Sequence, residues 1–212
     1  TSPNLLGPGH IGKSSMHYPD GNPTSGCWKA TYADTFGAVG TQDWTFETWF
    51  MPTSDTAKDE GLPGPGHTVL TQATGTDAWG LNIVFQSRSD GTLSGVWTAP
   101  APHIYYGLSG TWQGWGAHDG TVTVTYEPGV WAHWVWQREG DEVTIYKDGV
   151  LVLKESGAGA DIPVHSAADH MTIGCRELHG ANSNEMLDAS YWDDMRFTLG
   201  AARWPACPSG SR

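Results

Sequence analysis

Positive charge is scarce in this chain of 212 residues: 11 Lys and Arg stand against 23 Asp and Glu, a formal net charge of −12. Nucleic-acid binding needs a basic surface that neutralises phosphates, so the composition excludes this class of function. No apolar run approaches the roughly 18 residues of a membrane span, and no membrane insertion is expected. The first residues, TSPNLLG, lack the basic and apolar regions of a signal peptide, although an initiator Met or a longer leader could precede Thr1.

Cysteine is also rare. Cys27, Cys175 and Cys207 are the three present, and none forms a Cys-x-x-Cys pair. The odd number leaves at least one of them free or paired between chains, and the sequence does not choose which two could form a disulfide. The chain also has no Asn-x-Ser/Thr sequon without a central proline. A heavily glycosylated secreted protein is therefore disfavoured.

Aromatic residues, by contrast, are abundant: 12 Trp, 7 Tyr and 5 Phe provide apolar surface for one sizeable domain. Residues 43–51 carry large apolar groups on both sides, which is typical of a strand inside a two-layer sandwich. Asp148-Gly149 is a strong hairpin signal, because both residues tolerate positive φ. The other predicted strands include 79–85, 121–126, 131–138, 142–147 and 150–154. About ten short strands and no helical periodicity predict an all-β fold, a two-sheet antiparallel β-sandwich.

Residues 98–120 carry the strongest functional signal. This stretch is rich in glycine and aromatic residues, and we predict a long loop, a feature that is often functional in compact domains. Sugar rings stack on Trp and Tyr while adjacent polar groups bind their hydroxyls. The candidate glycan-binding residues are Tyr105, Tyr106, Trp112, Trp115, His103, Gln113, His118 and Asp119. Two other roles stay open for these rings, as a lid over the sandwich or at a subunit interface. An acidic, Gly/Pro-rich loop is predicted at 53–67.

Signals for metal binding and catalysis are weak. None of the nine His residues has the spacing of a zinc site. Calcium accepts loop carboxylates and carbonyls without a compact motif, so Asp34 and Asp188 are its candidate ligands, and the expected cofactor is none or Ca²⁺. Glu185 and Asp188 are three apart, which places them on opposite faces of a strand, unlike the paired acids of a glycosidase. Residues 193–194 (Asp-Asp) are expected at a strand end.

Residues 7–14 satisfy the phosphate-binding pattern G-x-x-x-x-G-K-[ST]. That chemistry needs a buried strand before the loop and a helix after it. Here only a few residues precede the pattern, and the following Pro-containing segment cannot sustain a helix. We therefore interpret 7–14 as part of a Gly/Pro-rich lead-in and not as a nucleotide site.

Four stretches resemble the concanavalin A-like, laminin-G-type jelly rolls. Residues 43–52 (DWTFETWFMP) are similar to the family's F-T-[IV]-E-x-W-[FV]-x-P strand, and 128–138 (PGVWAHWVWQR) to G-x-W-x-H-[VL]-A-x-x-R. The others are 143–150 (VTIYKDGV), similar to L-Y-x-D-G-x, and 171–174 followed by 192–197. The resemblance implies a sandwich over 25–204, an extended lead-in at 1–24 and a tail at 205–212. Trp134 and Trp136 depart from the pattern, which has smaller aliphatic residues there, so neighbouring residues must leave room for them.

The segment 193–204 resembles the D-[DE]-[VL]-R-[IL]-T-x-G-x-A-R-Y ending of such domains in bacteriophage structural proteins. This implies a non-enzymatic protein of the virion surface, in a decoration, capsid-associated or tail-associated role, that binds host or environmental glycans. Its expected partners are other virion proteins or copies of itself. Two alternatives remain: a glycoside hydrolase or polysaccharide lyase on the same jelly roll, and a free, secreted lectin module.

Overall fold

The computed structural model describes residues 4–7, 15–18, 28–31, 42–52, 66–73, 79–86, 101–108, 111–116, 127, 129–156, 170–173 and 190–203. Side chains are described at 15, 42–51, 127, 129–154 and 190–203. These ranges contain thirteen strands and no helix, so none of their elements is a membrane-spanning helix. The all-β prediction is confirmed.

Seven strands form one antiparallel sheet, in the spatial order β1-β2-β13-β4-β9-β10-β11. They are β1 Asn4–Gly7, β2 Ser15–Tyr18, β13 Ser190–Leu199, β4 Trp44–Pro52, β9 Ala132–Glu139, β10 Glu142–Lys147 and β11 Val150–Ser156. Strand β2 begins directly after the pattern at 7–14, where a phosphate-binding loop would need a helix. The rejection of a nucleotide site is therefore supported by the fold.

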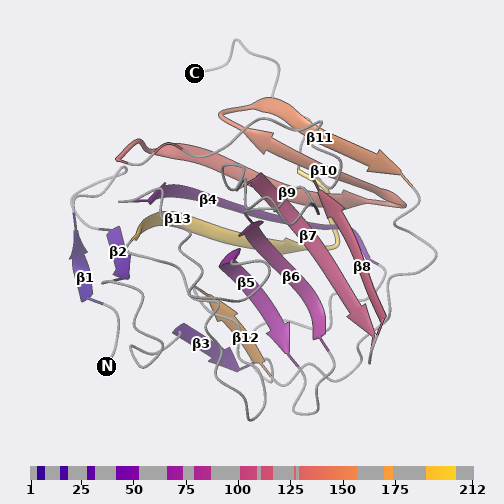
Figure 1. The fold of residues 1–212 in the computed structure, drawn as a ribbon, viewed down its shortest axis with the longest axis horizontal. Coiled ribbons are helices and arrows are strands. Elements are labelled where there is room, and N and C mark those ends of the chain that lie inside the picture. Colours follow the sequence, from indigo (N-terminus) through magenta and orange to yellow (C-terminus); the bar gives the residue numbers. More distant parts are fainter. Residues whose placement is uncertain are drawn as a thin grey trace, which may run out of the picture.

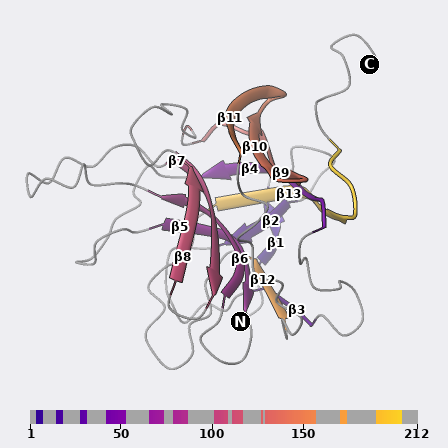
Figure 2. The same cartoon turned by 90° about the vertical axis from the view of Figure 1, so that its right-hand side faces the viewer.

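Six strands form the second sheet, in the order β3-β12-β5-β6-β7-β8. They are β3 Trp28–Thr31, β12 His170–Ile173, β5 Gly66–Ala73, β6 Trp79–Gln86, β7 Ala101–Leu108 and β8 Thr111–Gly116. Figure 1 shows β5 to β8 running obliquely across β4, β9 and β13. In the view turned by 90°, β5, β7 and β8 lie to one side of the molecule and β9 to β11 to the other (Figure 2).

Most of the predicted strands are confirmed. The strand predicted at 43–51 is β4, one residue later at Trp44–Pro52, and the strand predicted at 142–147 is β10. The turn between β10 and β11 has positive φ at both Asp148 (51°) and Gly149 (78°). The predicted strand at 121–126 lies outside the described residues. The prediction of a loop over 98–120 is wrong for 101–108 and 111–116, which are the paired strands β7 and β8. The glycines that favoured a loop, Gly107, Gly114 and Gly116, are paired across these two strands instead.

The central strands β4, β9 and β13 separate an apolar face from a polar one. Phe46 pairs in register with Trp136 on one side and with Phe197 on the other, and the rings of Phe46 and Trp136 lie 5.9 Å apart. Burying side chains of this size contributes about 1.5–3 kcal/mol each. The largest fully buried side chains are Trp44, Trp134, Trp136, Trp192, Phe46, Phe50 and Ile145. All of them lie on the apolar face, which is the core side of this sheet.

The room for Trp134 and Trp136 comes from small neighbours. Trp134 lies opposite Thr48 on β4, and Ala132 occupies the next position along the same face of β9. The two indole rings stack, with centroids 5.9 Å apart and an interplanar angle of 23°. Lys147 places its Nζ over the ring of Trp134, 5.5 Å from the centroid. This pair therefore fills space that a Thr and an Ala leave open.

Strand β13 contains a β-bulge. Asp193 pairs with Trp49 but Arg196 pairs with Glu47, so three steps on β13 match two on β4. Asp194 in between has a positive φ of 45°, and its N–H donates to Oδ1 of Asp193 at 2.9 Å. The expectation that 193–194 end a strand is wrong, because they lie in the middle of β13. The bulge instead places Asp193 and Arg196 on one face of the sheet.

Candidate functional site

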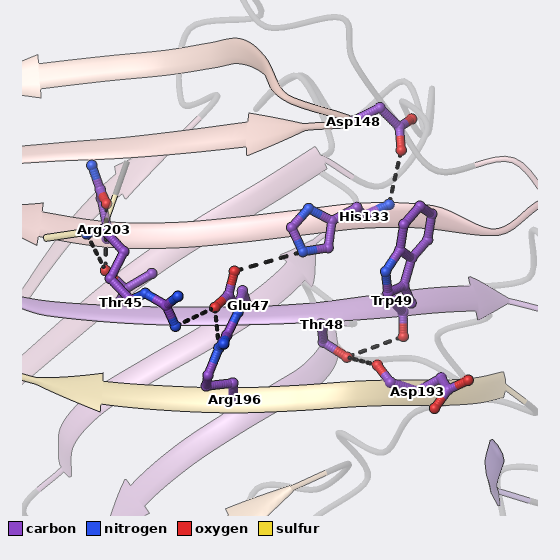
Figure 3. A network of polar contacts seen from close by, with 10 residues as sticks. Thr45, Glu47, Thr48, Trp49, His133, Asp148, Asp193, Arg196 and Arg203 are labelled. Carbon is purple, nitrogen blue, oxygen red and sulfur yellow. Dashed lines mark hydrogen bonds and ion pairs between the residues drawn. The ribbon is translucent and has the colours of Figure 1, made fainter. Parts of the chain in front are cut away.

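Glu47 is the centre of a polar network on the face of the seven-stranded sheet opposite the core (Figure 3). Its side chain is only 5% exposed. The Oε1 atom accepts a hydrogen bond from Nε of Arg196 and another from Nη1 of Arg203, at 3.1 Å in the second case. A carboxylate this deeply buried needs such charged partners, because an unpaired buried charge is strongly destabilising.

The aromatic end of the network is formed by His133 and Trp49. Nε2 of His133 lies 3.8 Å from Oε2 of Glu47, and its ring centroid lies 5.2 Å from that of Trp49. The turn after β10 positions this histidine: the His133 N–H donates to Oδ1 of Asp148 at 2.9 Å, and the Asp148 N–H donates to the His133 carbonyl at 2.8 Å. The network therefore continues from the two arginines to a half-buried indole.

The chain after β13 is attached to the same face. The Arg203 N–H donates to Oγ1 of Thr45 at 3.0 Å, and that hydroxyl donates to the Ala201 carbonyl at 3.2 Å. Gly200 N donates to the Asp43 carbonyl at 2.7 Å. These three bonds hold residues 200–203 against β4, so that the Arg203 guanidinium reaches Glu47.

The sequence did not predict this network, because its residues lie far apart in the chain. Glu47, His133 and Arg196 are polar positions of three of the four family-like stretches, and Arg203 lies in the segment 193–204. They are separated by up to 156 residues in the chain. Only the strand order β13-β4-β9 brings them together. Within the described residues, no group of three or more His, Cys, Asp or Glu side chains could hold a metal ion.

The predicted glycan-binding residues lie at the edge of the six-stranded sheet. His103, Tyr105 and Tyr106 belong to β7, and Trp112, Gln113 and Trp115 belong to the edge strand β8. His118 and Asp119 lie outside the described residues, as do the calcium candidates Asp34 and Asp188. Whether any of these residues binds a ligand stays a prediction.

The register divides these residues between the two faces of the sheet. Trp115 belongs to a cross-strand row of apolar residues, which reads Trp28, Ile173, Leu70, Ile83, Ile104 and Trp115 from β3 to β8. The neighbouring row, on the other face, reads Lys29, Thr172, Thr71, Asn82, Tyr105 and Gly114. Because side chains alternate along a strand, Tyr105 and Trp112 share the more polar face, whereas Tyr106, Gln113 and Trp115 share the apolar one.

Each ring residue on the polar face pairs with a glycine. Trp112 lies opposite Gly107, Tyr105 opposite Gly114, and His103 opposite Gly116. On the apolar face the pairs are Tyr106 with Gln113 and Ile104 with Trp115, in which both partners carry side chains. Glycine inside a strand often marks a place where a ligand or another backbone approaches closely. By register, three positions with aromatic or imidazole residues on β7 and β8 therefore each have a glycine as their cross-strand partner.

Comparisons with known proteins agree with this architecture. The profile of a family described as Laminin_G_3, Concanavalin A-like lectin/glucanases superfamily, matches residues 28–198. No curated protein matches the sequence. Structural similarity is extensive at low sequence identity.

Three solved structures illustrate this similarity. The binding domain of Paraclostridial Mosquitocidal Protein 1 has a TM-score of 0.63 at 12% identity, over 96% of this chain and 44% of that one. The heptameric SAP-like pentraxin from Limulus polyphemus has a TM-score of 0.57 at 12% identity, over 85% and 73%. Domains LG4-5 of the mouse laminin α1 chain have a TM-score of 0.55 at 8% identity, over 94% and 44%. The chain thus spans less than half the length of two of these structures.

Proposed function

Because the chain belongs to the concanavalin A-like lectin/glucanases superfamily, we propose that it is a non-enzymatic glycan-binding protein of a virion surface. Its structural neighbours are mostly binding domains, which is compatible with a role in binding and not in catalysis. The fold is shared by proteins with different ligands, so the argument for a glycan depends on the site.

The observation that carries the proposal is the pairing of His103, Tyr105 and Trp112 with three glycines. A sugar ring stacks its C–H face on an indole or a phenol ring only where no neighbouring side chain covers that ring. Trp and Tyr are also stiff, so fixing them on binding costs little entropy. The polar row beside them, which includes Asn82 and Thr71, offers hydrogen-bonding groups for sugar hydroxyls on the same face of the sheet.

The virion location is supported by the resemblance of residues 193–204 to bacteriophage structural proteins. The formal net charge of −12 suits a protein that remains soluble on an exposed surface. Copies of the same chain or other virion proteins are its proposed partners. Detection of the chain on purified particles by immunogold labelling tests this location, and its absence from intact particles would refute it.

The glycan site is tested by screening the full chain on a glycan array and titrating the best hit. We expect Trp112→Ala and Tyr105→Ala each to weaken binding about fivefold or more, since stacking on one aromatic ring contributes on the order of 1 kcal/mol or more. Titrations with Ca²⁺ and with EDTA decide between the two cofactor expectations, none or Ca²⁺ held by Asp34 and Asp188. If both aromatic variants bind like the wild type, the assignment of this face is wrong.

Two further variants test whether binding depends on the face of the sheet that carries Tyr105 and Trp112. Gln113 is also a candidate from the sequence, but its register places it on the apolar face, so on the proposed assignment Gln113→Ala should leave glycan affinity unchanged. Gly107→Thr places a β-branched side chain opposite Trp112 and should reduce binding while the thermal midpoint shows that the sheet is retained. Equal effects of Gln113→Ala and Trp112→Ala would contradict the division into faces.

A further inference from the structure

Three ring-bearing positions on β7 and β8 follow one another along the strands. His103 and Tyr105 are two residues apart on β7, and Trp112 pairs with Gly107, the next β7 position on the same face of the sheet. Because a strand rises about 3.4 Å per residue and neighbouring strands lie about 4.8 Å apart, the row advances in steps of about 7 Å and spans about 14 Å from His103 to Trp112. A single monosaccharide is shorter than this row.

The edge strand β8 carries glycine beside the two ring positions of β7. It stands last in the order of the six-stranded sheet, next to β7 (Figure 1). Its residues opposite Tyr105 and His103 are Gly114 and Gly116, which have no Cβ. Glycine in a strand often marks a place where a ligand approaches the backbone closely. This composition favours a ligand that lies along the strand over one that is held at a single point.

The strands at this end of the sheet also lack charge. None of the residues of β5, β6, β7 and β8 is Asp, Glu, Lys or Arg, whereas 16% of the whole chain is charged. The row of Tyr105 instead contains Asn82 and Thr71, whose amide and hydroxyl groups both donate and accept hydrogen bonds. The net charge of −12 also repels polyanions. These strands therefore favour a ligand rich in hydroxyl groups and without charge.

From this row, and resting on the proposed glycan-binding function, we propose that β7 and β8 bind three consecutive units of a neutral, linear glycan chain. Tyr105 is the central position of the row, and His103 and Trp112 are its two ends. Each further unit that stacks on a ring should raise the binding constant about fivefold, up to three units. Affinity therefore depends on the length of the glycan chain and not on salt.

The experiment is NMR titration of the full chain with cello-, xylo- and malto-oligosaccharides of one to six units, and with oligogalacturonates of the same lengths. We expect at least one neutral series to bind, with an affinity at least about tenfold higher for the trisaccharide than for the monosaccharide and nearly constant beyond four units. This affinity should be the same at roughly 50 and 500 mM NaCl, because binding forms no ion pair that salt could screen.

Variants at the end and at the centre of the row should differ in their effects. Trp112→Ala should weaken trisaccharide binding about fivefold and disaccharide binding less, because a disaccharide still reaches His103 and Tyr105. Tyr105→Ala should weaken both. Trp112→Tyr keeps a ring at the end of the row and should retain the preference for the trisaccharide. Gln113→Ala is the matched control: it is the β8 neighbour of Trp112, lies on the apolar face and should change neither affinity. Thermal midpoints close to that of the wild type show that each variant retains the sheet.

Equal affinity for the monosaccharide and the hexasaccharide of a binding series would overturn the row of three positions. So would the failure of all three neutral series to bind, although binding of other glycans on the array would then leave the proposed function standing. Tighter, salt-dependent binding of oligogalacturonates would overturn the neutral character of the ligand. Equal losses for disaccharide and trisaccharide in Trp112→Ala would overturn its place at the end of the row.

Discussion

Replacing Glu47 by Gln removes the negative charge beneath two arginines while keeping the shape of the side chain. In the native protein the carboxylate is 5% exposed and accepts hydrogen bonds from both Arg196 and Arg203. The amide of Gln can still accept a hydrogen bond. The change in stability of this variant therefore reports the contribution of the Glu47 charge more than that of its packing.

The expected change in the free energy of unfolding is the balance of attraction, repulsion and desolvation of these charges. Each guanidinium–carboxylate pair near a protein surface is attractive by about 4 kcal/mol, and two guanidiniums about 6 Å apart repel each other by about 3 kcal/mol. Burying the carboxylate costs several kcal/mol, which the variant regains in part. The arginines are 50% and 37% exposed and remain partly hydrated. We therefore expect Glu47→Gln to lower the free energy of unfolding by about 2 kcal/mol, below the 3–5 kcal/mol of a fully buried broken pair.

Urea unfolding followed by tryptophan fluorescence measures this loss, since four Trp residues with described side chains are fully buried. Glu142→Gln is the control: its ion pair with Lys154, at 2.8 Å, lies between side chains that are 38% and 50% exposed, and its loss should fall within the error of the measurement. In a double-mutant cycle, Glu47→Gln combined with Arg203→Gln should cost less than the sum of the two. A loss below about 0.5 kcal/mol for Glu47→Gln would refute the view that this network stabilises the fold.

Three further predictions concern the surroundings of the network. Asp194 has a φ of 45°, so Asp194→Gly should leave the free energy of unfolding within about 0.5 kcal/mol of the wild type, whereas Asp194→Val should lose at least about 1–2 kcal/mol; equal values in urea unfolding would show that the bulge carries no strain. Thr45→Val removes the hydroxyl that binds residues 201 and 203, and we expect a loss of about 1–2 kcal/mol with faster proteolysis after β13; unchanged proteolysis would contradict this attachment. The pKa of Lys154 is raised above 10.5 by its hydrogen bond to Glu142 and by the charge of that carboxylate. Any stability from this pair is present below pH 10.5 and is lost as the pH rises through the higher folded-state pKa, so the small difference in unfolding free energy between wild type and Lys154→Met should not grow at high pH; a gap that widens there would contradict the sign.

Local signals in the sequence predicted β4, β9, β10 and β11 of the seven-stranded sheet, but not β1 and β2, which lie in the predicted lead-in 1–24. The segments 43–51 and 142–147 are strands, and Asp148-Gly149 forms the turn with positive φ that this dipeptide favours. These features depend on residues that are close in the chain, so their pattern is visible without knowledge of the fold. The glycines of β7 and β8 were misread, because a glycine in a strand and a glycine in a loop look alike until the partner strand is known.

The amino-acid sequence by itself determined the class of the protein: an acidic, aromatic-rich, all-β sandwich. Only the tertiary structure decided which faces the important residues occupy. The bulge at Asp194 shifts the register by one residue, which places Arg196 on the face of Glu47 and Phe197 on the core face. The pairing of β7 with β8 likewise places Trp112 opposite a glycine and Trp115 opposite Ile104. The physical reason is the same in both cases: a strand has a period of two, so its register against a distant strand, and not its own composition, decides what each residue meets.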